Sequence, residues 1–311
     1  MKLYTLIDSK QYVQTNCYQH QMSIALEERF DVHYVTLDSF DFSKVPAGAP
    51  VLSRLRLRSI VQNLPRLKGA LASRPIMVYD QDPWESFLAN STYSGAYQKI
   101  YDTLNVSTFL NVSHWWRDRV LELGLPSRFV QIWTLPQYCR SEPIPWKQRQ
   151  HDAVFCGTLY SRRKAFFDDL ARHGVNVEVI PAGKSFVDYL NAIANSRVAI
   201  RSERVEWPII TAQGPMLLTS ANALWKRDIE TAAVGCFSMR DLDAEAKSWS
   251  VDDISTIVPF LDAEGAAGNF QRIMSLHPDD ADALIKQGIE YVKNAPGWNI
   301  TCDVIEDVLR Q

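Results

Sequence analysis

The sequence lacks the features of a disulfide-stabilised, zinc-binding or membrane-spanning protein. Its 311 residues include an odd number of cysteines without a Cys-x-x-Cys pair or a Cys/His cluster, namely Cys17, Cys139, Cys156, Cys236 and Cys302. Such cysteines are typical of reduced, buried thiols in a cytoplasmic protein, and no zinc site is expected. No apolar run approaches the roughly 20 residues that cross a bilayer, and the segment after Met1 is too mixed for a signal peptide, so we expect a soluble protein.

The chain also lacks an excess of positive charge. Its net charge is −3 and its isoelectric point is near 6.1, which excludes the strongly basic surface of a dedicated nucleic-acid-binding protein. A local basic groove is still allowed. Basic residues gather between Pro50 and Leu71, namely Arg54, Arg56, Arg58, Arg66 and Lys68. They form either a solvated helix face or a surface that meets an anionic acceptor or a membrane interface, so peripheral membrane contact stays open.

Length and composition predict two α/β domains. Hydrophobic residues make up 46% of the sequence, enough for a sizeable interior, and the chain is long for a single core. Strand-like and helix-like segments alternate in both halves, which is typical of parallel sheets covered by helices. The expected strands are 3–7, 32–37, 75–79, 108–112, 129–133, 153–156, 175–180, 198–200 and 236–239. The expected helical segments are 15–30, 50–71, 97–104, 113–123, 162–173, 186–194, 225–235, 254–261, 269–276, 279–294 and 300–309.

One charged pair stands out on the expected helix 225–235. Arg227 and Glu230 are three residues apart and therefore share a helix face. Ala232, Ala233 and Gly235 would let this helix lie close against a sheet before the next strand begins. Taken alone, the pair is either a surface ion pair or a guanidinium and a carboxylate presented together at one end of a helix.

A glycine turn and a basic helix start follow the expected strand 153–156. Gly157 and Thr158 begin the turn, and Arg162, Arg163 and Lys164 open the helix. A glycine lets the backbone approach a ligand, and a helix N-terminus presents free amides with a partial positive charge. The segment predicts a pyrophosphate site, with an ordinary strand-to-helix turn as the alternative.

The stretch Arg227-Asp228-Ile229-Glu230-Thr231-Ala232-Ala233-Val234-Gly235 resembles the nucleotide-sugar signature of two-domain GT-B glycosyltransferases, especially the CgeB-like and GT4-like groups. The resemblance implies two doubly wound Rossmann-like domains facing a cleft. It implies an acceptor-side domain at 1–140, a nucleotide-sugar domain at 152–295 and a C-terminal helix at 296–311 that packs back toward the first domain. The segment 141–151, with two prolines and no apolar periodicity, is predicted as the linker.

The resemblance also implies roles for individual residues. Glu230 would hold the ribose hydroxyls, and Arg227 would support it or meet the phosphates. Arg162 or Arg163, with the turn at Gly157 and Thr158, would bind the donor diphosphate. Further donor-side positions are Gly183, by backbone contacts to the base, and Arg201, which with Glu203 forms either a loop ion pair or part of the sugar site. One departure is Asn222, where GT4-like enzymes carry a second carboxylate; it would cap a helix or bind a sugar hydroxyl, and the stereochemical outcome is left open.

Asp80-Gln81-Asp82 follows the expected strand 75–79 and suggests two functions. Asp82 would be a general base on an acceptor hydroxyl, because Pro83 and Trp84 would desolvate it, and His114 is the alternative base. The same aspartates also match the Asp-x-Asp metal site of GT-A glycosyltransferases.

The sequence thus predicts a metal-independent glycosyltransferase, without a cofactor, that moves a sugar from a UDP- or GDP-sugar to a hydroxyl acceptor. The alternatives are a metal-dependent GT-A-like enzyme and a non-catalytic protein that binds a nucleotide or a sugar.

Overall fold

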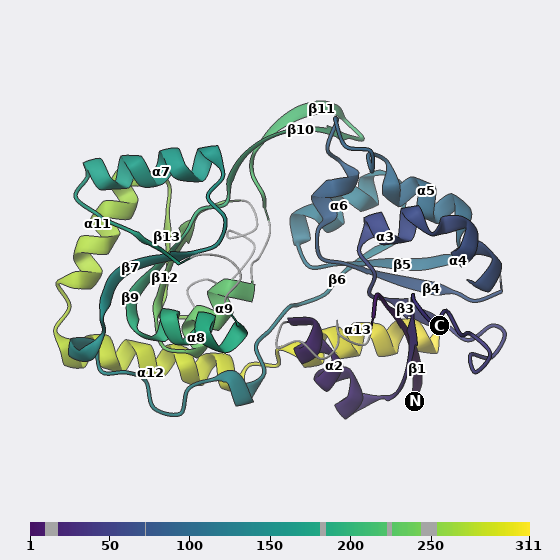
Figure 1. The fold of residues 1–311 in the computed structure, drawn as a ribbon, viewed down its shortest axis with the longest axis horizontal. Coiled ribbons are helices and arrows are strands. Elements are labelled where there is room, and N and C mark those ends of the chain that lie inside the picture. Colours follow the sequence, from purple (N-terminus) through teal and green to yellow (C-terminus); the bar gives the residue numbers. More distant parts are fainter. Residues whose placement is uncertain (10–17, 72, 181–184, 223–225, 244–253) are drawn as a thin grey trace. The chain divides into compact units, whose positions relative to one another are not determined.

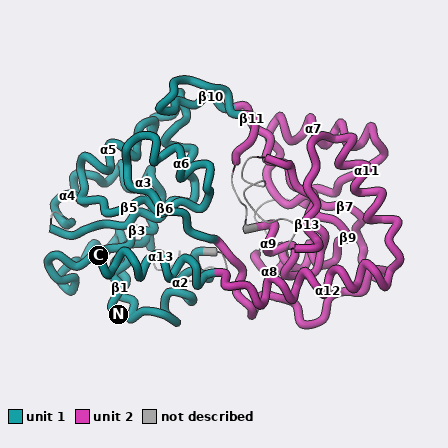
Figure 2. The backbone as a smooth tube through the Cα atoms, turned by 180° about the vertical axis from the view of Figure 1, so that it is seen from behind, with its two compact units in different colours: residues 1–131, 207–218, 298–311 teal, residues 132–206, 219–297 magenta. Residues whose placement is uncertain are grey.

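The computed structural model describes the chain except for residues 10–17, 72, 181–184, 223–225 and 244–253 (Figure 1). The chain divides into two compact units (Figure 2). Unit 1 comprises residues 1–131, 207–218 and 298–311, and unit 2 comprises residues 132–206 and 219–297. Both units are built on parallel sheets, as the sequence predicted.

Unit 1 contains a six-stranded parallel sheet in the order β2-β1-β3-β4-β5-β6. Its strands are β1 Lys2–Ile7, β2 Asp31–Thr36, β3 Val51–Ser53, β4 Ile76–Asp80, β5 Val106–Asn111 and β6 Ser127–Phe129. Its described helices are α2 Tyr18–Arg29, α3 Leu57–Gln62, α4 Leu64–Leu71, η1 Pro83–Ser86, α5 Ala96–Thr103, α6 His114–Glu122 and α13 Trp298–Arg310. Because β2 and β3 flank β1 on opposite sides, the strand order reverses between β1 and β3. Open α/β sheets bind ligands at the carboxyl ends of the strands at such a switch point.

Unit 2 contains a five-stranded parallel sheet in the order β13-β12-β9-β7-β8. Its strands are β7 His151–Cys156, β8 Glu178–Ile180, β9 Ser196–Arg201, β12 Phe237–Asp241 and β13 Ile257–Phe260. The described helices are η2 Pro136–Tyr138, η3 Trp146–Gln148, α7 Ser161–Arg172, α8 Phe186–Ala194, α9 Lys226–Ala233, α11 Ala263–Met274 and α12 Pro278–Asn294. Here the order reverses between β7 and β9, which puts the expected ligand edge at Cys156 and Arg201.

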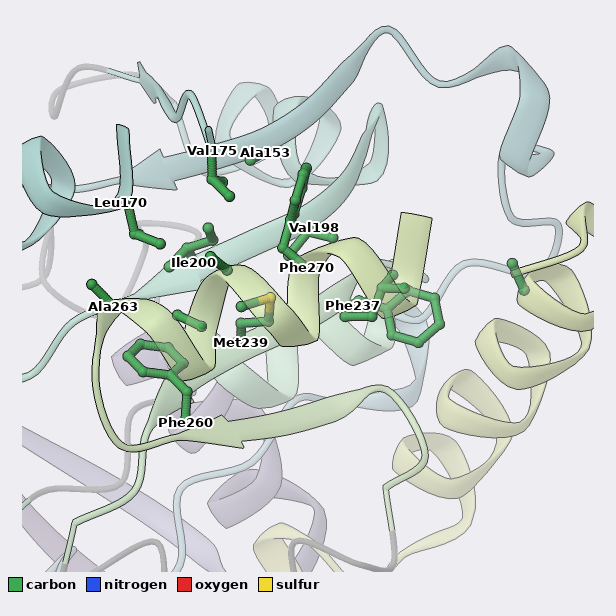
Figure 3. Packing of buried hydrophobic residues seen from close by; sticks show 14 of the residues in the cluster. Ala153, Leu170, Val175, Val198, Ile200, Phe237, Met239, Phe260, Ala263 and Phe270 are labelled. Atoms are coloured by element: carbon green, nitrogen blue, oxygen red, sulfur yellow. The ribbon is translucent and has the colours of Figure 1, made fainter. Parts of the chain in front are cut away.

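The central strands of the unit 2 sheet, β9 and β12, are buried at consecutive positions, as expected for strands covered on both faces. Val198 and Ile200 of β9 point into one cluster with Met239 of β12 and Phe260 of β13 (Figure 3). Ala199, between the two β9 residues, belongs to the cluster on the other face. This alternation is the period of two that a strand imposes on its side chains.

Three strand segments differ from the sequence-based expectation. β3 lies inside the segment 50–71, and residues 254–261, predicted as a helix, contain β13 instead. A four-residue apolar run is too short for periodicity to separate a strand from a helix. Pro259 fits β13 because this is an edge strand, where a missing N–H removes no ladder bond. The third difference is the two-stranded hairpin of β10 Arg204–Thr211 and β11 Gly214–Ser220, which the sequence did not indicate.

The ends of the predicted domains pack as follows. Helix α13 belongs to unit 1, where the Thr301 hydroxyl donates to the Gln131 carbonyl (2.6 Å) and Arg29 pairs with Glu306 (2.7 Å). The segment 141–151 belongs to unit 2, where Trp146 is buried and its backbone N–H donates to Asp282 (2.9 Å). None of the described helices has the length and apolarity needed to cross a membrane.

A buried polar network fixes the carboxyl end of β4. Asp80 is 2% exposed, and its carboxylate accepts hydrogen bonds from the Tyr97 hydroxyl (2.5 Å) and from the Asp82 backbone N–H (3.0 Å). The same hydroxyl lies 2.9 Å from Asn111, the residue opposite Asp80 on β5. Burial raises the pKa of Asp80 to about 7. Asp80 therefore shapes the turn that leads into Asp82.

The glycine after α9 generates a prediction about stability. Gly235 has φ of +77°, and a Cβ there would lie 2.9 Å from Ile285 and 3.0 Å from Ile289. Gly174 has a similar φ of +83° with open space around it. We expect Gly235→Ala to lower the free energy of unfolding by ~1–3 kcal/mol more than Gly174→Ala does, because only the first also overpacks the core. Urea denaturation of both variants tests this, and equal losses would contradict it.

Asp80 predicts a pH dependence of stability. An unfolded aspartate has a pKa near 3.9, so between about pH 4 and 7 the folded chain holds a proton that the unfolded chain has released. The burial of this group therefore costs stability as the pH rises through that window. We expect the stability of the wild type relative to Asp80→Asn to fall from pH 4 to pH 7, measured by denaturation at each pH. The exposed Asp31→Asn is the control, and a pH-independent difference for Asp80→Asn would refute the prediction.

Candidate functional site

The switch point of unit 2 brings Arg227 onto the glycine turn after β7. The Nη1 atom of Arg227 donates to the carbonyl of Cys156 (3.1 Å). A Cβ on Gly157 would lie 2.9 Å from that same Nη1, and the backbone at Gly157 has a φ of +154°. A larger residue at this position would strain the backbone and displace the guanidinium from its present place. The two motifs that the sequence singled out, about seventy residues apart, are thus in direct contact.

A second arginine lies beneath this turn. Arg201, at the end of β9, is 1% exposed, and its guanidinium lies 3.4 Å from the Cys156 carbonyl and 3.0 Å from the Thr231 hydroxyl on α9. Within the described residues, its buried Nε atom has no hydrogen-bond partner. Two guanidinium groups therefore meet at one carbonyl, Arg201 buried and Arg227 exposed. The arrangement concentrates positive charge at the Cys156–Gly157 turn, where glycine leaves the backbone without a side chain.

Glu230 lies one turn along α9 from Arg227 and is 4% exposed. Its carboxylate accepts a hydrogen bond from the Tyr189 hydroxyl (3.1 Å), and the same hydroxyl lies 3.4 Å from Arg201. Burial, together with the charge of Glu230, raises the pKa of Tyr189. Tyr189 thus joins Glu230 to Arg201. Its role could not be predicted from the sequence, because a tyrosine on an amphipathic helix is ordinarily a packing residue.

The structure gives Arg163 and Arg162 different surroundings. The donors of Arg163 point to the Ser202 carbonyl (2.7 Å), the Thr158 carbonyl (3.2 Å) and Glu203 (3.4 Å). Arg163 therefore ties the exposed Thr158 turn to the end of β9. Burial raises the pKa of Glu203 to about 7, and Arg163 opposes this shift. Arg162 is exposed and pairs with Glu206.

A buried ionic network lies behind the site, and the sequence did not predict it. Arg240 of β12, 1% exposed, pairs with Asp228 (3.1 Å) and Asp243 (3.4 Å), and Asp228 also accepts from the Ser238 hydroxyl (2.7 Å). Asp228 lies in the first turn of α9, where the helix dipole favours a carboxylate. The network fixes the beginning of α9, and with it Arg227. Its one signal in the sequence is Arg240, a charged residue that directly follows the apolar Met239 of an expected strand.

Asn222 and Gly183 are the two remaining donor-side positions that the sequence suggested. Asn222 adopts a φ of +46°, and its side-chain amide donates to the Ser220 carbonyl (3.2 Å). Residues 223–225, between Asn222 and α9, lie outside the described residues, so the predicted helix cap stays a prediction. Gly183 lies outside the described residues.

In unit 1, Asp82 follows the buried Asp80 and is partly exposed. Burial raises the pKa of Asp82 to about 6; Arg56 and Arg58 oppose this shift, and Glu85 adds to it. A carboxylate with this pKa is ionised at neutral pH and still basic enough to accept a proton from a hydroxyl. The raised pKa of Asp82 therefore suits a general base.

His114 begins α6 after Ser113, whose side chain accepts from the Trp116 backbone N–H as predicted for a cap. The imidazole stacks on Phe129 with ring centroids 3.7 Å apart. Burial lowers the pKa of His114, so the ring is neutral at pH 7 and packed on one face. In the described part of the chain, no group of three or more His, Cys, Asp or Glu side chains is arranged to hold a metal ion.

No protein-family model matches the sequence, and no curated protein matches it. Solved structures, however, resemble the chain over its whole length. Anabaena HepE in complex with UDP-glucose aligns with a TM-score of 0.62 and 11% identity, covering 100% of both chains. The DNA-modifying enzyme β-glucosyltransferase aligns with a TM-score of 0.64 and 11% identity, also over 100% of both chains.

Sucrose-phosphate synthase from Thermosynechococcus elongatus aligns with a TM-score of 0.61 and 12% identity, covering 100% of this chain and 99% of that one. These proteins are glycosyltransferases of the GT-B type, with two Rossmann-like domains. At this level of identity the similarity concerns the fold. The chain therefore has the GT-B fold that its sequence predicted.

Proposed function

We propose that the protein transfers a sugar from a nucleotide sugar, a UDP- or GDP-sugar, to a hydroxyl acceptor. The observation that carries the proposal is the contact of Arg227 with the Cys156–Gly157 turn above the buried Arg201. Open backbone and two guanidinium groups at a sheet switch point suit the diphosphate of such a donor.

Arg227 is the residue of this pair that reaches solvent, and it would contact the diphosphate directly. Charge builds up on the leaving diphosphate as the glycosidic bond to it breaks, and a fixed guanidinium stabilises that charge without a metal ion. Arg163 acts on the site indirectly in this proposal, because its donors already bind Thr158, Ser202 and Glu203. Glu230 would accept hydrogen bonds from the ribose, held in place by Tyr189.

Unit 1 would supply the base for the acceptor. Asp82 would accept the proton of the acceptor hydroxyl as that oxygen bonds to the anomeric carbon. Asp80 supports this role by accepting the Asp82 backbone N–H, and its own carboxylate is engaged by Tyr97. This burial, together with the GT-B fold, does not favour the GT-A alternative with a metal on both aspartates.

The similar proteins agree with the proposal. HepE is described with UDP-glucose, and an α-glucosyltransferase with a TM-score of 0.64 is described with UDP and DNA. We assign the chain to the CgeB-like and GT4-like side of these enzymes on its Arg227-to-Gly235 stretch. We also propose a cytoplasmic location, in keeping with the described cysteines Cys139, Cys156, Cys236 and Cys302, which are not joined in disulfides.

The donor site predicts nucleotide binding that depends on α9. We expect UDP or GDP to raise the melting temperature, and Arg227→Ala to raise the Kd of that nucleotide about tenfold or more, because a charge-assisted hydrogen bond is lost. Glu230→Gln should weaken the binding of the nucleoside diphosphate and leave the binding of inorganic pyrophosphate unchanged. Arg172→Gln, at the far end of α7, is the charge-matched control for Arg227. Calorimetric titration tests this, and unchanged binding by both site variants would overturn the donor site.

Asp82 predicts a loss of transfer with donor binding intact. We expect Asp82→Asn to lower kcat by about 100-fold or more, the usual size of a general-base effect, at an unchanged Kd for the nucleotide. In the wild type, kcat/KM should fall as the pH is lowered through about 6, because the base becomes protonated. A steady-state pH profile with radiolabelled donor measures both. A fully active Asp82→Asn enzyme would remove Asp82 from the mechanism.

A further inference from the structure

Charged side chains of both signs line the switch point of unit 1. Asp8 follows β1, Arg56 and Arg58 follow β3, and Asp82 follows β4. These three strands are neighbours in the parallel sheet, with Leu6 opposite Ser53 and Ser53 opposite Val78. All four side chains therefore lie at the same edge of the sheet, where open α/β sheets bind ligands.

The two arginines lie near both carboxylates without pairing with either. Each of them lowers the pKa of Asp8 and of Asp82, while burial raises both. Within the described part of the chain, neither guanidinium makes a hydrogen bond or an ion pair. Ser59, in α3, also lowers the pKa of Asp8.

The other arginines of this region are satisfied by the protein. Arg54 is buried and donates to Gln19 and Ser23, Arg66 donates to the Leu37 carbonyl, and Arg74 donates to the Val45 carbonyl. Arg56 and Arg58, by contrast, are half-buried. Partial burial of a guanidinium without an acceptor is unfavourable, so both groups are poised for an anion from outside the chain.

We propose that the acceptor carries an oxyanion, a phosphate or a carboxylate, which binds Arg56 and Arg58 while the reacting hydroxyl faces Asp82. This inference rests on the proposed glycosyl transfer and specifies its acceptor class. A guanidinium fork matches the geometry of phosphate and carboxylate oxygens, and a carboxylate accepts from a hydroxyl. A ligand with both groups uses both signs of charge in the cluster, whereas a neutral sugar leaves the arginines without acceptors.

Matched pairs of small molecules test the acceptor class. Glucose 6-phosphate and glucuronate are compared with glucose, and glycerol 3-phosphate with glycerol, by calorimetric titration of the full chain. We expect at least one anionic member to bind at least about tenfold more tightly than its neutral counterpart, the gain of a charge-assisted hydrogen bond. The failure of every anionic member to bind, or equal binding of the neutral ones, would overturn the proposal.

Single-charge variants locate the binding. Arg56→Gln and Arg58→Gln should each raise the Kd of the best anionic ligand about tenfold. The Kd of its neutral counterpart should not change. Lys68→Gln removes one exposed charge from the same region and should have no effect. Arg227→Ala should weaken UDP or GDP and leave this ligand unchanged; the reverse result would place the anion in unit 2 and refute the inference. If the wild type bound neither UDP nor GDP, that result would instead count against the proposed function.

Discussion

The contact between Arg227 and the carbonyl of Cys156, made across Gly157, is the interaction on which the candidate site depends. It joins the end of β7 to the beginning of α9, and a Cβ at position 157 would lie 2.9 Å from the guanidinium, so a larger residue there would displace it. The contact is itself supported from below by Arg201 and from behind by the ion pairs of Arg240 with Asp228. Breaking a buried ion pair on one side is costly, so the pair of Arg240 with Asp228 holds the first turn of α9, which carries Arg227, against the sheet.

The two units share one sheet architecture but carry different charged residues at its ligand-binding edge. Each has a parallel sheet whose strand order reverses once, and each gathers charged residues at the carboxyl ends of the strands beside that reversal. In unit 2 the exposed charge is positive and lies over open backbone, which suits a diphosphate. In unit 1 the charges have both signs, and Asp82 retains a partly buried carboxylate whose pKa is raised to about 6. Under the proposed function, unit 2 would bind the donor and unit 1 would activate the acceptor.

The sequence predicted much of this fold because long apolar strands and amphipathic helices have clear periods. The short strands β3 and β13 were not predicted. They have three and four residues, which is too few to show a hydrophobic period, and they are strands because they pair with neighbours in the sheet. At the site, the sequence predicted that Arg227 and Glu230 lie on one face of a helix, since residues three apart share a helix face. The engagement of Arg163 by Ser202 and Glu203 was not, because such partners are distant in sequence and are brought close only by packing.

Hydrogen–deuterium exchange with and without saturating UDP or GDP tests the central claim most directly. The account predicts slower exchange of backbone amides in residues 156–163 and 226–234 when the nucleotide binds, because the glycine turn and the first turns of α9 would contact the diphosphate and the ribose. Peptides from β4 and η1 of unit 1 should then respond to an acceptor rather than to the nucleotide alone. Protection by the nucleotide that is confined to other segments, with residues 156–163 and 226–234 unchanged, would contradict the assignment of this site.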